Sequence, residues 1–132
     1  MKTFILTFIS FFTLLSCSNN DDENTQQNNE IVGTWKLVKF EAGFGPTFNY
    51  DGEITWKFNT NNTIDVTIAN GTQVYSSLPL SNTGNYTYNI PNSNVLNLSQ
   101  TENWSYEISN SQLIINQNPS ADGRRLTFNK VQ

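Results

Sequence analysis

The chain has 132 residues, with seven Lys and Arg against eleven Asp and Glu, a single Cys and no His. The formal charge of −4 excludes the basic surface that nucleic-acid binding requires. The absence of His removes the commonest general base and the commonest transition-metal ligand. The length fits one domain, and a hydrophobic content of 36% is enough for a small core.

The first residues, MKTFILTFISFFTLLSC, have the pattern of an export signal. Lys2 precedes an apolar stretch that is shorter than the roughly 20 residues of a membrane-spanning helix. The end of the stretch, Leu-Leu-Ser-Cys, resembles the processing site of bacterial lipoproteins. The resemblance implies that residues 1–16 are removed and that the Cys17 thiol carries diacylglycerol and fatty acyl chains such as palmitate. An ordinary signal peptide followed by a buried structural Cys is the alternative.

Residues 18–30, SNNDDENTQQNNE, contain no apolar side chain. A segment that can bury nothing cannot offset the entropy of ordering, so residues 17–30 are expected to form a lipidated, disordered tether. Its acidic cluster, Asp21 to Glu23, is similar to the signal that places some lipoproteins on the outer face of a Gram-negative outer membrane. We therefore expect a lipid-anchored outer-membrane protein exposed at the cell surface. The alternative for the acidic cluster is that the segment is a solvated spacer whose charge is incidental.

From residue 31 onward, apolar and polar residues alternate with a period of two, which predicts β-strands. The segments with this pattern, the fourth of them less regular, are 34–41, 53–59, 63–69, 72–78, 85–90, 95–99, 103–109, 112–117 and 124–131. Short connectors rich in Asn, Gly and Ser join them, which favours antiparallel neighbours. Closing such a sheet removes its edges and encloses the apolar faces. The expected fold class is all-β, an up-and-down antiparallel barrel of about eight or nine short strands over residues 31–132, with a two-sheet sandwich as the alternative.

The first strand opens with Gly33-Thr34-Trp35, which resembles the Gly-x-Trp motif of lipocalins. The later segments TWKFNTNNTI, GNYTY, VLNLS, WSYEISNSQLII and RRLTF follow in an order that resembles the bacterial lipocalin-like lipoprotein domain. That resemblance implies an Arg of the last strand packed on Trp35 at the base of the barrel. Arg124 is the residue expected there, because it shares a strand face with the apolar residues that follow, and Arg125 is the other candidate. The chain lacks the Thr-Asp-Tyr motif and the C-terminal helix of classical lipocalins.

The same resemblance implies a cup that binds a small hydrophobic or amphipathic molecule, with the connector 42–52 over its mouth. The candidate lining residues are the aromatic residues of this connector and of the inward strand faces: Phe44, Phe48, Tyr50, Trp56, Phe58, Tyr86, Tyr88, Trp104 and Tyr106. Two alternatives remain open for them. They form a plain core, or the barrel is solid and acts as an adhesion or inhibitor module whose loops bind a protein or a glycan.

No catalytic set is recognisable in the sequence. Without His, the usual serine and cysteine triads are unavailable, and neither a phosphate-binding loop nor metal-ligand spacing is present. We therefore expect a non-catalytic protein without a cofactor or a metal. It is expected to be a monomer that contacts the membrane through the lipid on Cys17 and does not bind nucleic acid.

Overall fold

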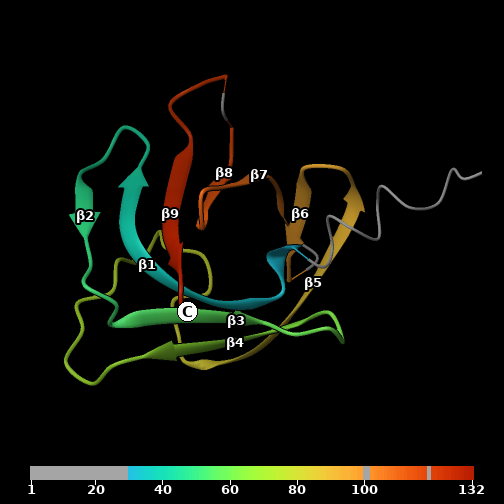
Figure 1. Cartoon of the computed structure of the whole chain (residues 1–132). Helices are drawn as coiled ribbons and strands as arrows, with labels where there is room; N and C mark the ends of the chain where they lie inside the picture. The colour runs from blue at the N-terminus through green and yellow to red at the C-terminus, as the bar shows by residue number, and fades with distance from the viewer. Residues whose placement is uncertain (1–29, 100–101, 119) are drawn as a thin grey trace, which may run out of the picture.

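The structure is a computed structural model that describes residues 30–132, except 100–101 and 119. The expected signal segment 1–16, and the tether 17–30 apart from Glu30, lie outside the described residues. Nine strands are present in this part of the chain (Figure 1). They are β1 (Gly33–Ala42), β2 (Thr47–Asn49), β3 (Ile54–Phe58), β4 (Thr63–Ile68), β5 (Gly84–Asn92), β6 (Val95–Leu98), β7 (Glu102–Ser109), β8 (Gln112–Asn116) and β9 (Arg124–Lys130).

Eight of these strands form a closed antiparallel barrel. The strand order is β1-β3-β4-β5-β6-β7-β8-β9, and β1 pairs in turn with β9. β2 is an additional strand that pairs only with the end of β1. The up-and-down antiparallel barrel expected from the period-two pattern is therefore confirmed, and the sandwich is not formed.

β1 is the longest strand and pairs with three others, β2, β3 and β9. Its first half pairs with β3, from Gly33 opposite Phe58 onward, and its second half pairs with β2. The register with β9 shifts between Leu37 and Lys39, which marks a β-bulge. A bulge bends a strand and increases its twist, which a small barrel requires.

Asn residues form most of the tight turns because Asn tolerates positive φ better than other non-glycine residues. Asn62 and Asn94 have φ angles of 61° and 63° in the β3–β4 and β5–β6 turns. In the β7–β8 hairpin, Asn110 and Ser111 both have positive φ, as a two-residue type I′ turn requires. The short connectors predicted from the sequence at these three places are confirmed.

Two predicted segments differ from the structure. Residues 72–78 are not a strand, because β5 pairs directly with β4 and leaves no ladder for them. They instead form part of a long connector, 69–83, with turns in which Thr72 N donates to Ala69 O and Leu78 N to Tyr75 O. Conversely, the connector 42–52 is not all loop, because β2 forms within it and pairs with β1.

The strand registers define two ends of the barrel. The first described residues and the turns 59–62, 93–94 and 110–111 lie at one end, here called the N-terminal end. The connectors 43–53, 69–83 and 117–123 lie at the opposite end, here called the loop end, where β3 begins and β4 finishes on the left of Figure 1. Two of these connectors touch at Gly43, which has a φ of 73° and lies so close to the Asp122 carbonyl that a Cβ would clash.

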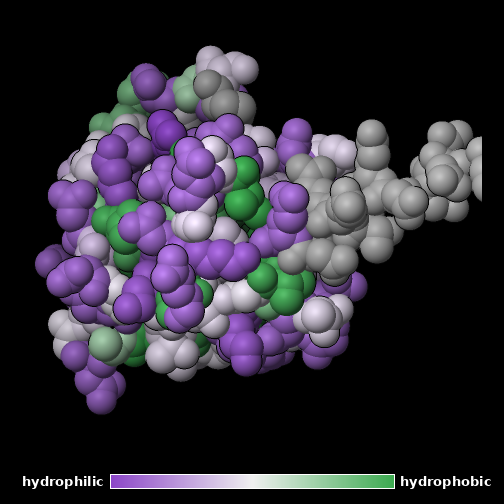
Figure 2. Space-filling view, in the orientation of Figure 1, coloured by the Kyte–Doolittle hydropathy of each residue, from purple (hydrophilic) through white to green (hydrophobic). Residues whose placement is uncertain are grey.

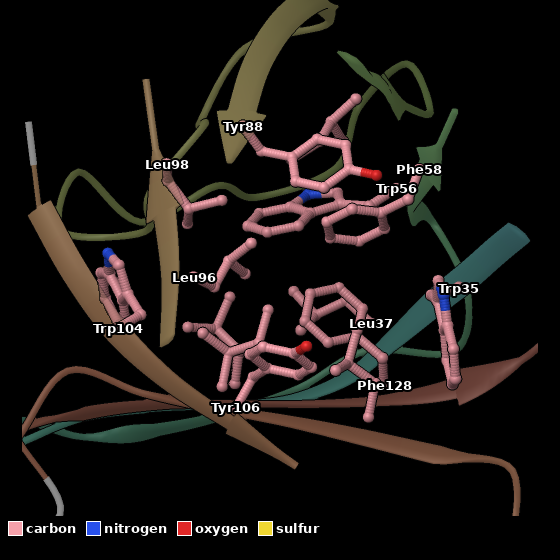
Figure 3. Packing of buried hydrophobic residues seen from close by; sticks show 14 of the residues in the cluster. Trp35, Leu37, Trp56, Phe58, Tyr88, Leu96, Leu98, Trp104, Tyr106 and Phe128 are labelled. Carbon is pink, nitrogen blue, oxygen red and sulfur yellow. The ribbon is translucent and has the colours of Figure 1, made fainter. Parts of the chain in front are cut away.

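The barrel interior is apolar and densely filled. Buried side chains come from every strand of the barrel, and the largest fully buried ones are the three indoles Trp35, Trp56 and Trp104 (Figure 3). Leu78 of the connector 69–83 is also buried, exposed to only 3%. The interior thus receives side chains from the strands and from a loop-end connector.

Candidate functional site

Five of the candidate lining residues point into the barrel, as the alternation predicts. Trp56, Phe58, Tyr88, Trp104 and Tyr106 are all buried in the core. The Trp56 ring lies 5.0 Å from that of Phe128, measured between centroids, and the Phe58 ring lies 5.1 Å from that of Tyr88. The strands therefore bring these residues together as mutually packed core. Tyr86 is half-buried at its margin.

Three buried polar atoms of this interior have no hydrogen-bond partner among the described residues: Trp56 Nε1, Trp104 Nε1 and Tyr106 Oη. Tyr88, by contrast, donates its hydroxyl to Asn59 O at 3.1 Å. Burial, together with the charge of Glu30 and the nearby Tyr88, raises the pKa of Tyr106 to about 12. Its hydroxyl therefore stays neutral at any physiological pH.

The N-terminal end is closed around Trp35, but not by Arg124. Trp35 Nε1 donates to the carbonyl of buried Ile31 at 2.7 Å, and Lys130 Nζ lies 5.2 Å from the indole centroid. The predicted contact between Arg124 and Trp35 is wrong. The antiparallel register places Lys130 opposite Trp35 and Arg124 opposite Ala42, at the far end of β1.

Arg124 instead organises the loop end. Its guanidinium lies over Trp104, 4.9 Å from the ring centroid, and pairs with Glu102 at 2.7 Å. It also donates to Gln117 Oε1 at 2.7 Å and to the Ser77 carbonyl at 2.8 Å. Arg124 is thus turned toward the barrel, as strand parity predicted, but its partners belong to the rim. It thereby fixes the connector 69–83. In this connector Leu78 is buried in the core, and Leu80 packs against the core from its edge.

Aromatic residues of the loop end form one wall of a surface groove. Phe48 of β2 packs between the core and the connector 69–83, with its ring centroid 6.2 Å from that of Phe40 and 3.5 Å from that of Tyr75. Tyr50 donates its hydroxyl to Gln73 O at 3.3 Å. Partial burial, then the charge of Glu53 and the neighbouring Tyr75, raises the pKa of Tyr50.

The groove has a volume of about 340 Å³. Besides Phe48 and Tyr50 it is lined by polar and small residues from both connectors, namely Asn49, Glu53, Ala69, Asn70, Gly71, Thr72 and Gln73. Two candidates from the connector 42–52 therefore do line a hollow, although it lies outside the barrel. We call this site the loop-end groove.

Phe44 does not line the loop-end groove. It occupies the turn between β1 and β2, is exposed to 94%, and borders a second hollow beside Asn103 and Asn118. The sequence marked Phe44, Phe48 and Tyr50 equally, as aromatic residues on one connector. The formation of β2 separates them, because it turns Phe48 toward Phe40 and leaves Phe44 at the tip of the hairpin.

The polar lining of the groove was missed by sequence reasoning. Asn49, Asn70 and Gln73 belong to a chain rich in Asn and Gln, so their composition carries no signal. They lie close together because the connector 69–83 folds back over β2. The sequence pattern predicts a strand at 72–78, and that prediction gives no reason to place these residues beside β2. Asn-Gly pairs such as 70–71 are typical of tight hairpin turns, but this pair lies within the long connector, where Gly71 has a φ of 83°.

No protein-family model and no curated protein matches the sequence. The closed eight-stranded antiparallel barrel is consistent with a lipocalin-like barrel. Within residues 30–132, leaving out 100–101 and 119, no group of His, Cys, Asp or Glu side chains has metal-binding geometry. In the same described part of the chain, no helix has the length and hydropathy needed to cross a bilayer.

The hydroxyls of Tyr106 and Tyr88 can be tested as a matched pair. Tyr106→Phe is expected to change the free energy of unfolding by less than about 1 kcal/mol, because no described partner is lost. Tyr88→Phe is expected to cost about 1 kcal/mol, because it removes the bond to Asn59 O. Denaturant unfolding of both variants measures the difference. A loss of more than about 2 kcal/mol for Tyr106→Phe would show that its hydroxyl has a partner in the folded protein.

Arg124 and Arg125 form a second matched pair. Arg124→Ala is expected to cost about 2 kcal/mol and to speed proteolytic cleavage within residues 72–83, because the tie to Ser77 O is lost. Arg125→Ala should stay within about 0.5 kcal/mol, because Arg125 is exposed and lies 3.9 Å from Glu41. Equal effects of the two substitutions on unfolding and on proteolysis would contradict the role given to Arg124.

Proposed function

We propose that this protein is a non-catalytic binding module, held at the outer membrane by a lipid on Cys17, that binds its ligand in the loop-end groove. In this proposal it is a lipocalin-like lipoprotein that uses the rim of the barrel in place of the interior. The β-barrel fold is compatible with small-ligand binding at either place, and the packing of the side chains favours the rim.

One observation carries the choice of site. The aromatic residues expected to line a cup are packed against one another, with Trp56 exposed to 0% and Tyr106 to 2%. A ligand between them would have to displace close-packed side chains, which is costly because protein interiors have few voids. The loop-end groove is already open to solvent and needs no such rearrangement.

The position of the groove also supports display away from the membrane. The chain enters the barrel at Ile31, which is buried at the N-terminal end beneath Trp35. The connectors 43–53 and 69–83 lie at the opposite end. A lipid anchor ahead of Ile31 would therefore leave the loop end facing away from its attachment point.

The outer surface supports a small binding site in preference to a broad apolar interface. In the face shown in Figure 2 the hydrophobic residues form separate small patches among hydrophilic ones. Of the large hydrophobic residues in the described chain, those that are exposed are Phe44 and Val131, which lie at opposite ends of the barrel. Extensive apolar patches are the usual mark of a large protein interface.

An interior site is the second candidate, and the unpartnered Trp56 Nε1 and Tyr106 Oη are what favours it. A small ligand with hydrogen-bond acceptors would satisfy both groups.

Two measurements on the purified full-length protein separate the candidates. An apolar fluorescent probe should remain dark on addition of the protein, and NMR screening of small polar and amphipathic compounds should shift amides within 47–53 and 69–73. Probe uptake, or shifts confined to Trp56, Trp104 and Tyr106, would overturn the loop-end site.

The lipid anchor has its own test. In a Gram-negative host, the protein is expected to incorporate labelled palmitate and to sediment with the outer membrane, whereas Cys17→Ser should lose both the label and the sedimentation. Substitution of a nearby residue of the same segment, Ser18→Ala, serves as the control and should change neither. An unlabelled wild-type protein, or a Cys17→Ser protein that is still labelled, would contradict lipidation at this residue.

A further inference from the structure

We infer that the ligand of the loop-end groove is a neutral carbohydrate. This inference rests on the proposed function, because it names the ligand class of the same groove. It follows from the hydrogen-bonding capacity of the lining residues, from their charge, from the aromatic wall and from the size of the groove.

The groove presents three amide side chains with unused hydrogen-bonding capacity. Asn49, Asn70 and Gln73 are exposed, and none of their side chains has a hydrogen-bond partner in the described part of the chain. Each amide offers a carbonyl acceptor and an NH₂ donor. Sugar hydroxyls also donate and accept, so adjacent hydroxyls of one ring can pair with both atoms of an amide. Two connectors supply these amides, Asn49 from β2 and the other two from 69–83.

The charge of the groove argues against an anionic ligand. Among its lining residues there is no Lys or Arg, and the single charged one is Glu53. The Glu53 carboxylate accepts the backbone N–H of Asp51 at 2.5 Å, which fixes it at the edge of the groove. Phosphate and carboxylate groups are normally bound by Arg, Lys or clustered backbone N–H groups. A neutral ligand, or a neutral part of a larger one, is what this lining accepts.

The aromatic wall argues against a purely polar solute such as an ion or a free amino acid. Tyr50 is held by its bond to Gln73 O, and the contact between Phe48 and Tyr75 supports the wall from behind. The C–H face of a pyranose is apolar and slightly positive, which suits the negative face of an aromatic ring. Small-ligand sites combine such apolar walls with a few polar groups that fix orientation.

The size of the groove limits the ligand. Its volume of about 340 Å³ is at the lower end of the roughly 300–1,000 Å³ that small-molecule sites occupy. A short oligosaccharide, or the terminal unit of a longer glycan, fits this space. An open groove also lets a long glycan continue into solvent beyond its terminal unit.

Glycan-array binding of the purified full-length protein tests the inference, with affinities then measured for any glycan that binds. The protein should bind one or more neutral glycans, and free sugar of the same kind should compete. Asn70→Ala combined with Gln73→Ala should weaken binding by about tenfold or more, because two hydrogen-bonding amides are lost. Asn92→Ala is the matched control: it removes an exposed amide from β5 at the N-terminal end and should leave the affinity unchanged. Circular dichroism verifies that each variant is folded.

The outcomes separate this inference from the proposed function. If no neutral glycan binds while another compound shifts the amides of 47–53 and 69–73, the carbohydrate inference is overturned and the loop-end site stands. If binding is restricted to anionic glycans and falls steeply with salt, the ligand is charged and the inference is again overturned. If a glycan binds equally to the wild type and to the double variant, the groove is not its site, and the loop-end assignment fails as well.

Discussion

The pairing of β1 with β9 is the constraint on which the rest of the structure depends. It converts a meander of short strands into a barrel without free edges, and it fixes which residues meet at each end. Trp35 opposite Lys130 defines the N-terminal end, and Ala42 opposite Arg124 defines the loop end. The bulge after Leu37 lets β1 bend enough to pair with β3 along one half and with β2 along the other.

The contacts of Arg124 depend on how the barrel closes, whereas alternation along the strand predicts only the direction of its side chain. Alternation along the last strand correctly placed its side chain on the inward face. The identity of its partner depended on register, which follows from the position of the bulge and from the lengths of the connectors. An Arg at the rim stacked on Trp104 joins β9, β7 and the connector 69–83, so one side chain fixes three segments that are far apart in sequence.

The regular parts of this fold were accessible from the sequence because each rests on a local rule. Period-two alternation located eight of the nine strands, and Asn-rich pairs located the tight turns, where Asn110 shows the positive φ that such turns need. β2 was missed because three residues within a Gly-rich connector carry no alternation. The loop-end groove was missed for a related reason: Phe48 and Tyr50 were recognisable as aromatic residues on a connector, whereas Asn49, Asn70 and Gln73 become a set only when the two connectors fold together.

The side chains that fill the barrel interior also support the groove at its rim. The indoles and phenyl rings that leave little space for an interior ligand also make the strands a rigid support, on which Phe40 holds Phe48 and the buried Leu78 holds its connector. The aromatic wall of the groove is packed before binding. A preformed wall loses little conformational entropy when a ligand arrives, and this favours affinity for small, weakly interacting solutes. Neutral sugars are solutes of that kind, because they offer neither charge nor a large apolar surface. A site that binds them through a few amides and one aromatic wall therefore gains from a wall that is packed before the ligand arrives.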